Sequence, residues 1–251
     1  MSIYDLNKEQ RKLLVDKINK EIIFDIESGE NTHLLTYFSD EDTYIRKTAY
    51  IAMGRIYKIK NELRSEIIKQ LDFLSDNEEA KVRQTVVNAA GEIGFTDFHR
   101  IEYLIEKGLF DEHHSVRNAV IGSIKKVGEK KPKEVLAFAK QFLHHEDKEV
   151  RREICHGIEL FGRTHPEDIL PLLKELQYDQ TARVRNTLIH VIGQISYKKG
   201  CLETVIKHLK TWENTELVKK AIDEIIDVHD RYKNFAIYTQ EQAIEIIEKE
   251  L

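Results

Sequence analysis

Apolar and polar residues follow the 3.6-residue period of amphipathic helices, and one such segment recurs along the chain. In residues 115–127 the small or aliphatic positions are Val116, Ala119, Val120, Ser123, Ile124 and Val127. Their spacing puts them on one face of a helix. Segments with the same pattern are 44–56, 81–93, 115–127, 149–161, 183–195 and 217–229. We expect a helix in each and name these the B helices.

A basic residue near the start of each B helix reveals the period. These residues are Arg46, Arg83, Arg117, Arg151, Arg185 and Lys219. The first spacing is 37 residues and the next four are each 34. A fixed period of this length is typical of a repeat architecture, in which every repeat contributes one supersecondary unit.

Shorter amphipathic stretches lie between the B helices, and we name them the A helices. They lie near 31–39, 61–74, 98–109, 132–144, 165–177 and 202–211. A unit of one A helix and one B helix cannot bury its apolar face alone, so we expect neighbouring units to stack. The sequence predicts a single domain, residues 1–251, with repeats at about 31–60, 61–97, 98–131, 132–164, 165–200 and 201–229. Residues 7–28 and 238–251 are predicted to cap its ends.

A polar residue precedes each basic residue by six positions. These residues are Asp40, Asn77, Asp111, His145, Asp179 and Glu213. Such a residue can close the turn before the B helix and can pair with the arginine of its own repeat or the next. We expect a structural ladder made of Arg46, Arg83, Asp111, Arg117, Arg151, Asp179 and Arg185. The alternative is that these arginines contact a ligand.

The repeated pattern Asp-x5-Val-Arg-x2-Ala/Val-x3-Gly/Ala-x-Ile/Val resembles HEAT repeats in their short bacterial form, over about residues 31–229. The last repeat departs from it, since Lys219 replaces arginine. The signature of tetratricopeptide repeats is missing. The resemblance implies an all-α fold, an α-solenoid superhelix of about six antiparallel helix pairs, with the B helices on its concave wall. Because this fold serves many tasks, it does not define a function.

If the B helices line a concave wall, residues one, five and nine positions after each basic residue face a groove. In the middle repeats these positions form a polar band. Its members are Gln84, Asn88, Asn118, Lys126, Arg152, His156, Asn186, His190 and Gln194. Ordinary helix surfaces favour Lys and Glu, and Asn is a poor helix former. The band therefore predicts recognition of a partner by amide, imidazole and guanidinium groups, with a plain solvated surface as the alternative.

Metal and catalytic sites are not predicted. Deoxyhypusine hydroxylase, which has HEAT-like repeats, carries His-Glu pairs directly after the arginine, but the equivalent positions here include Lys47-Thr48 and Arg152-Glu153. His156 and Glu159 form a lone pair of candidate ligands, which falls short of a complete set. The doublets His113-His114 and His144-His145 are expected in solvated turns, and Cys155 is expected as a packing residue. We predict no cofactor.

The sequence favours a non-catalytic protein-binding scaffold. A net charge of −5 argues against general nucleic-acid binding. One alternative is a nucleic-acid-binding protein or glycosylase similar to the HEAT-like alkylpurine DNA glycosylases, which use Trp and Asp in a basic groove; the single tryptophan here, Trp212, is expected in a turn. Another is an immunity protein for a bacterial toxin. Without a signal peptide or a long apolar run, we expect a cytoplasmic protein and no membrane partner.

Overall fold

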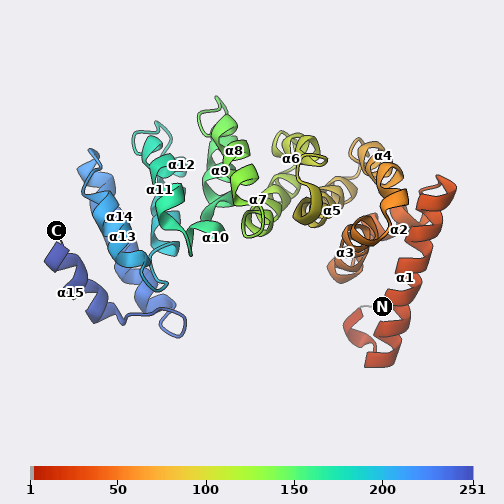
Figure 1. Ribbon diagram of the computed structural model, residues 1–251, viewed down its shortest axis with the longest axis horizontal. Helices are drawn as coiled ribbons and strands as arrows, with labels where there is room; N and C mark the ends of the chain where they lie inside the picture. Colours follow the sequence, from red (N-terminus) through yellow and green to blue (C-terminus); the bar gives the residue numbers. More distant parts are fainter. Residues whose placement is uncertain (1–2, 251) are drawn as a thin grey trace. The chain divides into compact units, whose positions relative to one another are not determined.

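The computed structural model describes residues 3–250, apart from the side chain of Tyr4, and this part of the chain is helical without strands (Figure 1). The α-helices are α1 (Lys8–Ser28), α2 (Thr32–Ser39), α3 (Thr43–Ile59), α4 (Arg64–Leu74), α5 (Ala80–Asp97), α6 (Glu102–Leu109), α7 (His114–Gly128), α8 (Pro132–Phe142), α9 (Lys148–Gly157), α10 (Glu159–Gly162), α11 (Pro166–Glu175), α12 (Ala182–Gln194), α13 (Cys201–Leu209), α14 (Thr215–Arg231) and α15 (Gln240–Glu250). Two short 3-10 helices lie at Ile3–Asp5 and Asn61–Leu63. None of the described helices has the length and apolar character that crossing a membrane requires.

The helices alternate as the sequence predicts, which confirms the all-α helix-pair fold. The A helices are α2, α4, α6, α8, α11 and α13, and the B helices are α3, α5, α7, α9, α12 and α14. One difference concerns the fourth B helix, which was expected to be continuous over 149–161. Instead, α9 ends at Gly157 and the short helix α10 begins at Glu159. This break separates His156 from Glu159.

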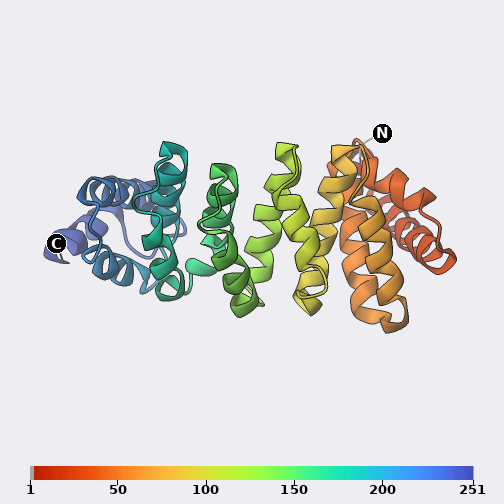
Figure 2. The same cartoon turned by 90° about the horizontal axis from the view of Figure 1, so that it is seen from above.

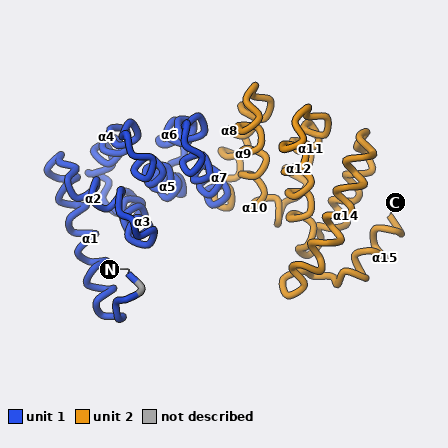
Figure 3. The backbone as a smooth tube through the Cα atoms, turned by 180° about the vertical axis from the view of Figure 1, so that it is seen from behind, with its two compact units in different colours: residues 1–127 blue, residues 128–251 orange. Residues whose placement is uncertain are grey.

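The chain forms two compact units, residues 1–127 and residues 128–251, which Figure 3 shows in different colours. The boundary falls at the end of α7. Each unit has its own core and is described by itself. One repeat domain with a concave groove along all six pairs remains a prediction.

In unit 1, B helices pack on each other and α1 covers the first pair. Helix α3 packs on α5, and α1 contacts α2, α3 and α4 (Figures 1 and 2). A capping box starts α1, because Asn7 and Gln10 each accept the other's backbone N–H, both at 2.9 Å. The predicted apolar stripe of α7 is buried at all six positions, from Val116 to Val127. Burial of such stripes holds the repeats together.

In unit 2, α12 packs between α9 and α14, and α15 covers the last pair by contacting α13 and α14. The predicted C-terminal cap thus appears as α15, while residue 251 lies outside the described residues. A close approach joins two B helices, because a Cβ added to Gly193 of α12 would lie 2.6 Å from Cγ of Glu224 on α14. A glycine at position 193 therefore allows α12 and α14 to pack this closely.

The polar residue six positions before the arginine closes a turn in the first five repeats, whereas the side chain of Glu213 in the last repeat is held by Lys174 and Gln177. Oδ1 of Asp40, of Asn77, of Asp111 and of Asp179 accepts the backbone N–H two residues later, at 2.7 to 2.9 Å. His145 accepts the same hydrogen bond through Nδ1 at 3.1 Å. The helix N-cap is therefore a later residue, such as Asp42 or Asp147. These Asx-type turns set where each B helix begins.

Candidate functional site

The repeated arginines are structural parts of the turns. In Arg83, Arg117 and Arg151, Nη1 donates to the backbone carbonyls six and five residues earlier, at 2.6 to 2.9 Å. Arg46 makes the same two contacts, with the carbonyls of Asp40 and Glu41. Each of these guanidinium groups therefore ties its B helix to the preceding turn.

Two rungs of an Arg–Asp ladder are present among the described residues, one in each unit. In unit 1, Arg83 Nε and Nη2 donate to Asp111 at 2.7 and 3.0 Å. In unit 2, Arg151 donates to Asp179 in the same way at 2.6 and 3.2 Å. Burial alone would raise the pKa of Asp111, but the hydrogen bonds from Arg83 and the His113 backbone outweigh it, so its pKa is lowered. Such two-point pairs are stronger than neutral hydrogen bonds.

In unit 1, the predicted polar band is partly used within the protein. Gln84 donates to the Ser115 carbonyl at 3.3 Å, and Asn88 donates to the Gln84 carbonyl at 2.9 Å. Lys126 pairs with Glu92 at 3.4 Å. Asn118 is exposed. Of these four band residues, Asn118 and Lys126 are therefore exposed, and Lys126 is paired within the unit.

In unit 2, two band residues are held inside the packing. The Arg152 side chain is 15% exposed and is held by Glu149 at 3.0 Å and Glu153 at 3.1 Å. Gln194 is 1% exposed, so the expectation that it faces a groove is wrong. It ends α12, and its Oε1 accepts a hydrogen bond from Arg163 Nη2 at 2.8 Å. Asn186 is exposed.

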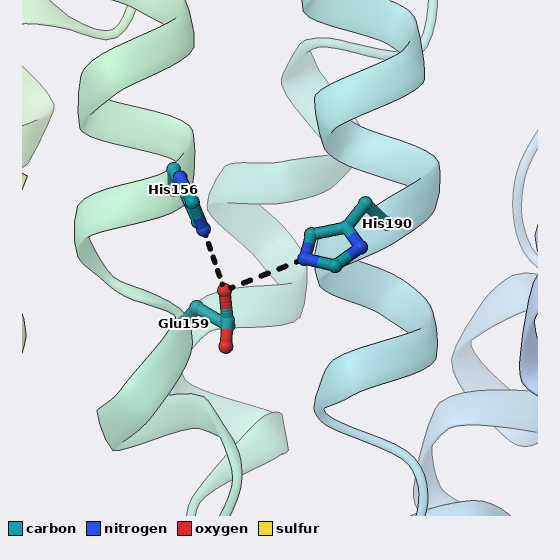
Figure 4. A group of neighbouring side chains, drawn as sticks. All are labelled: His156, Glu159 and His190. Carbon is teal, nitrogen blue, oxygen red and sulfur yellow. Dashed lines mark ion pairs between the residues drawn. The ribbon is translucent and has the colours of Figure 1, made fainter. Parts of the chain in front are cut away.

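The remaining band residues of unit 2, His156 and His190, converge on a buried carboxylate (Figure 4). Nε2 of His156 lies 3.1 Å from Oε2 of Glu159, and Nε2 of His190 lies 4.0 Å from the same oxygen. The Glu159 side chain is 1% exposed, while the imidazoles are 29% and 40% exposed. We name these three residues the His–Glu–His cluster.

Charged groups around the cluster hold its members in place. Arg163 Nη2 donates to Oε1 of Glu159, the oxygen that does not face the histidines. On the other side, Nδ1 of His190 lies 3.5 Å from Oε1 of Glu224, which also accepts a hydrogen bond from Arg231. These contacts involve Nδ1 of His190 and Oε1 of Glu159, whereas Nε2 of His190 and Oε2 of Glu159 lie 4.0 Å from each other.

Sequence reasoning identified each member but did not assemble the cluster. His156 and Glu159 were weighed as a lone pair on one helix, although His190 occupies the position of His156 one repeat later, 34 residues on. In a stacked repeat, equivalent positions on successive B helices are neighbours. The 34-residue period therefore already indicates that His190 lies beside His156 and Glu159.

Other candidate groups have structural partners. His113 stacks on His114 with ring centroids 4.7 Å apart, and His144 pairs with Glu175 at 2.6 Å. Cys155 is fully buried, and burial raises the pKa of its thiol, with a further contribution from Glu159. Trp212 is 5% exposed and donates to Nδ1 of His208 at 2.8 Å. A buried thiol and a buried indole are poorly placed for chemistry on a ligand.

Unit 2 also contains an open pocket of about 360 Å³ between the starts of α12 and α14. Its lining includes Arg185, Asn186, Lys220 and the exposed ring of Tyr178. Nη1 of Arg185 donates to the Asp179 carbonyl, as in the other repeats. The carboxylate expected for the next rung, Glu213, is instead held by Lys174 at 3.0 Å and by Gln177 at 2.7 Å. Arg185 therefore lines the pocket without the rung partner expected from the sequence, and the carboxylate of Glu216 lines the same pocket and interacts electrostatically with Arg185.

Comparisons with known proteins agree with this architecture. Residues 67–154 match the profile of HEAT repeats. Among solved structures, AlkD2 from Streptococcus mutans is similar at 17% identity and a TM-score of 0.56, over 84% of this chain and 96% of that one. A Crescerin TOG-domain structure is similar at 17% identity and a TM-score of 0.51, over 76% of this chain and 87% of that one. No curated protein matches the chain. The likenesses show a shared helical-repeat fold.

Proposed function

We propose that this chain is a non-catalytic protein-binding module that holds its partner through exposed side chains at the B helices of its repeats. HEAT-type repeats in residues 67–154 and the similar helical-repeat structures are consistent with a scaffold. The observation that carries the proposal is the incomplete Arg–Asp rung at Arg185, which lines an open pocket and, among the described residues, makes no two-point pair with a carboxylate like those of Arg83 and Arg151.

The pocket suits a carboxylate supplied by a partner protein. In the complete rungs, Nε and Nη2 of Arg83 and Arg151 grip an Asp from the next repeat. The same two groups of Arg185 can grip an Asp or Glu side chain, or a chain end, with the two-point geometry that carboxylates favour. Asn186 adds an exposed amide beside them. The expected partner segment is therefore acidic.

Pairing of the B-helix cations favours protein over nucleic acid. Lys126 pairs with Glu92, and Arg183 pairs with Glu149 at 3.1 Å. Lys220 pairs with Glu216 at 2.8 Å, so even in the pocket its charge is partly neutralised. Lys47 and Arg55 on α3 are exposed, but two positive charges are too few to bind a nucleic-acid backbone. Nucleic-acid binding is therefore the second candidate function. The similarity in fold to AlkD2 is compatible with it.

A quantitative pull-down from the source organism tests this function. The full chain serves as bait beside Arg185→Lys, Asn186→Ala and a control, Lys140→Ala, which alters an exposed residue of the A helix α8. We expect a protein that the wild type and the control retain. Arg185→Lys keeps the charge but loses the two-point grip, and we expect a loss of about 2 kcal/mol in binding free energy, as at an interface hot spot.

Equal retention by all four baits would contradict the pocket as the binding site. Recovery of nucleic acid that disappears on nuclease treatment, with no retained protein, would contradict the proposed function and favour the second candidate. If the retained protein is a toxin, the module belongs to the immunity class weighed from the sequence.

A further inference from the structure

The His–Glu–His cluster has the donor atoms of a metal site, and no part of the proposed protein-binding function depends on it. Two imidazole nitrogens and one carboxylate oxygen meet in unit 2, with their ligand atoms all within 4.8 Å of one another. Among residues 3–250, these are the His, Cys, Asp and Glu side chains that gather in this way. They come from α9, α10 and α12.

The spacing of the three atoms is close to what one ion requires. Bonds of about 2.0–2.1 Å in a tetrahedral site place ligand atoms about 3.4 Å apart. The observed separations from Oε2 of Glu159 are 3.1 Å to His156 and 4.0 Å to His190. A shift of roughly 1 Å by the half-exposed His190 ring closes the gap, which is within the reach of a side-chain adjustment.

The groups around the ligands also match those of a metal centre. A ligating histidine usually directs its other ring nitrogen at a carboxylate, and Nδ1 of His190 lies 3.5 Å from Glu224. With a proton on Nδ1, the lone pair of Nε2 faces the carboxylate oxygen of Glu159. Two acceptors that face each other are stabilised by a cation between them. Arg163 donates to the opposite oxygen of Glu159, Oε1, and so holds the carboxylate with Oε2 toward the histidines.

The ligand types select a class of ion. Imidazole together with carboxylate suits zinc and other divalent transition metals, whereas magnesium and calcium prefer sets made of oxygen atoms alone. Three protein ligands leave a fourth position for water or an incoming group. The partly exposed histidines provide the entry path.

We propose that His156, Glu159 and His190 bind one zinc ion, or a similar divalent transition metal, and thereby tie α9 and α10 to α12. The ion completes the coordination of the buried Glu159 carboxylate and leaves one position open to solvent. The alternative is a metal-free cluster of hydrogen bonds, in which a histidine carries the proton that separates the two acceptors.

Equilibrium dialysis of the metal-free full chain against zinc sulfate, with the bound metal measured by mass spectrometry, tests the proposal. We expect one zinc per chain that excess magnesium does not displace. His156→Asn and His190→Asn each lower the affinity at least about tenfold. His144→Asn is the matched control, because His144 is an exposed histidine of the same unit with its own carboxylate partner, Glu175. The control retains wild-type affinity.

A second readout separates loss of ligands from loss of folding. Cobalt replaces zinc in the dialysed protein, and its visible absorption reports the coordination number. The wild type is expected to show the intense bands of a four-coordinate ion, which both asparagine variants lose while their circular dichroism is unchanged. Absence of zinc from the wild type would overturn the proposal, and so would full binding by both folded asparagine variants.

Discussion

The buried imidazole of His229 shows how a single side chain can make stability depend on pH. His229 is 0% exposed on α14, and its Nδ1 lies 2.8 Å from the Ile225 carbonyl, which accepts its hydrogen bond. Nε2 is buried without a hydrogen-bond partner. Burial lowers the pKa of His229 below the ordinary value of 6.5, and the Ile225 carbonyl opposes this only in part. The folded state therefore favours neutral His229.

We expect unit 2 to lose stability as the solution becomes acidic. The contribution of a lowered pKa is complete above the unfolded value of about 6.5 and is lost as pH falls through the lower folded value. Urea unfolding at about pH 7.5 and about pH 5.5 measures the change in free energy of unfolding. His229→Leu removes the titrating group and reduces the difference between the two values. An unchanged difference in that variant would assign the acid sensitivity to other groups.

Residue roles that recur with the repeat period were predictable from the sequence, and roles that depend on one particular neighbouring side chain were not. Arg83 and Asp111 recur in a fixed phase, so their turn and ladder contacts could be anticipated. Gln194 occupies an equally regular position, yet it is buried, because α12 ends there and Arg163 reaches it from the preceding repeat. Periodicity also could not show that Glu213 is taken by Lys174 and Gln177, which leaves Arg185 without the rung partner expected from the sequence.

At the scale of the helix and its turn, the Arg83–Asp111 rung joins the start of α5 to the turn before α7. The same arginine has two acidic neighbours in different surroundings. Asp111 is 10% exposed and makes two hydrogen bonds with Arg83, whereas Glu112 is 90% exposed and lies 3.7 Å away. A partly buried two-point pair stabilises far more than a solvated contact, because water and salt screen the latter.

We expect Asp111→Ala to lower the free energy of unfolding of unit 1 by about 1–3 kcal/mol, because the largely buried Arg83 side chain, 13% exposed, loses a charged partner. Glu112→Ala is the control and is expected to change it by less than about 0.5 kcal/mol. Urea denaturation followed by circular dichroism measures both. Equal effects of the two substitutions would show that the rung contributes no more than a surface contact.

The boundaries of the helices were predictable because their signals are local. Apolar stripes placed every A and B helix, and the polar residue six positions before each arginine does close the turn. The break between Gly157 and Glu159 was not predictable, since the apolar stripe of that segment runs through it without interruption. After the break α10 packs closely on α11, since a Cβ added to Gly162 of α10 would overlap the side chain of Ile169 on α11. Such a contact depends on how two helices meet.

At the scale of the whole molecule, charge pairing separates the two candidate functions. The chain carries a net charge of −5 but has 39 Lys and Arg side chains, so a local basic surface is compatible with its net charge. The structure shows carboxylates on the B helices beside several of those cations. Glu149, for example, forms ion pairs with both Arg152 and Arg183. These carboxylates reduce the positive potential that phosphates would meet.

This pairing predicts how the full chain behaves toward duplex DNA. Each phosphate neutralised by a protein cation contributes about −0.9 to the slope of log affinity against log salt. We expect no measurable, salt-dependent affinity of the wild type in fluorescence anisotropy, and no base release from alkylated DNA. Glu92→Ala combined with Glu149→Ala removes the carboxylates that pair with Lys126 and Arg183, and we expect weak binding with a negative slope to emerge. If the wild type already binds DNA with a steep slope, the carboxylates do not neutralise these helices, and nucleic acid becomes the better candidate for the partner.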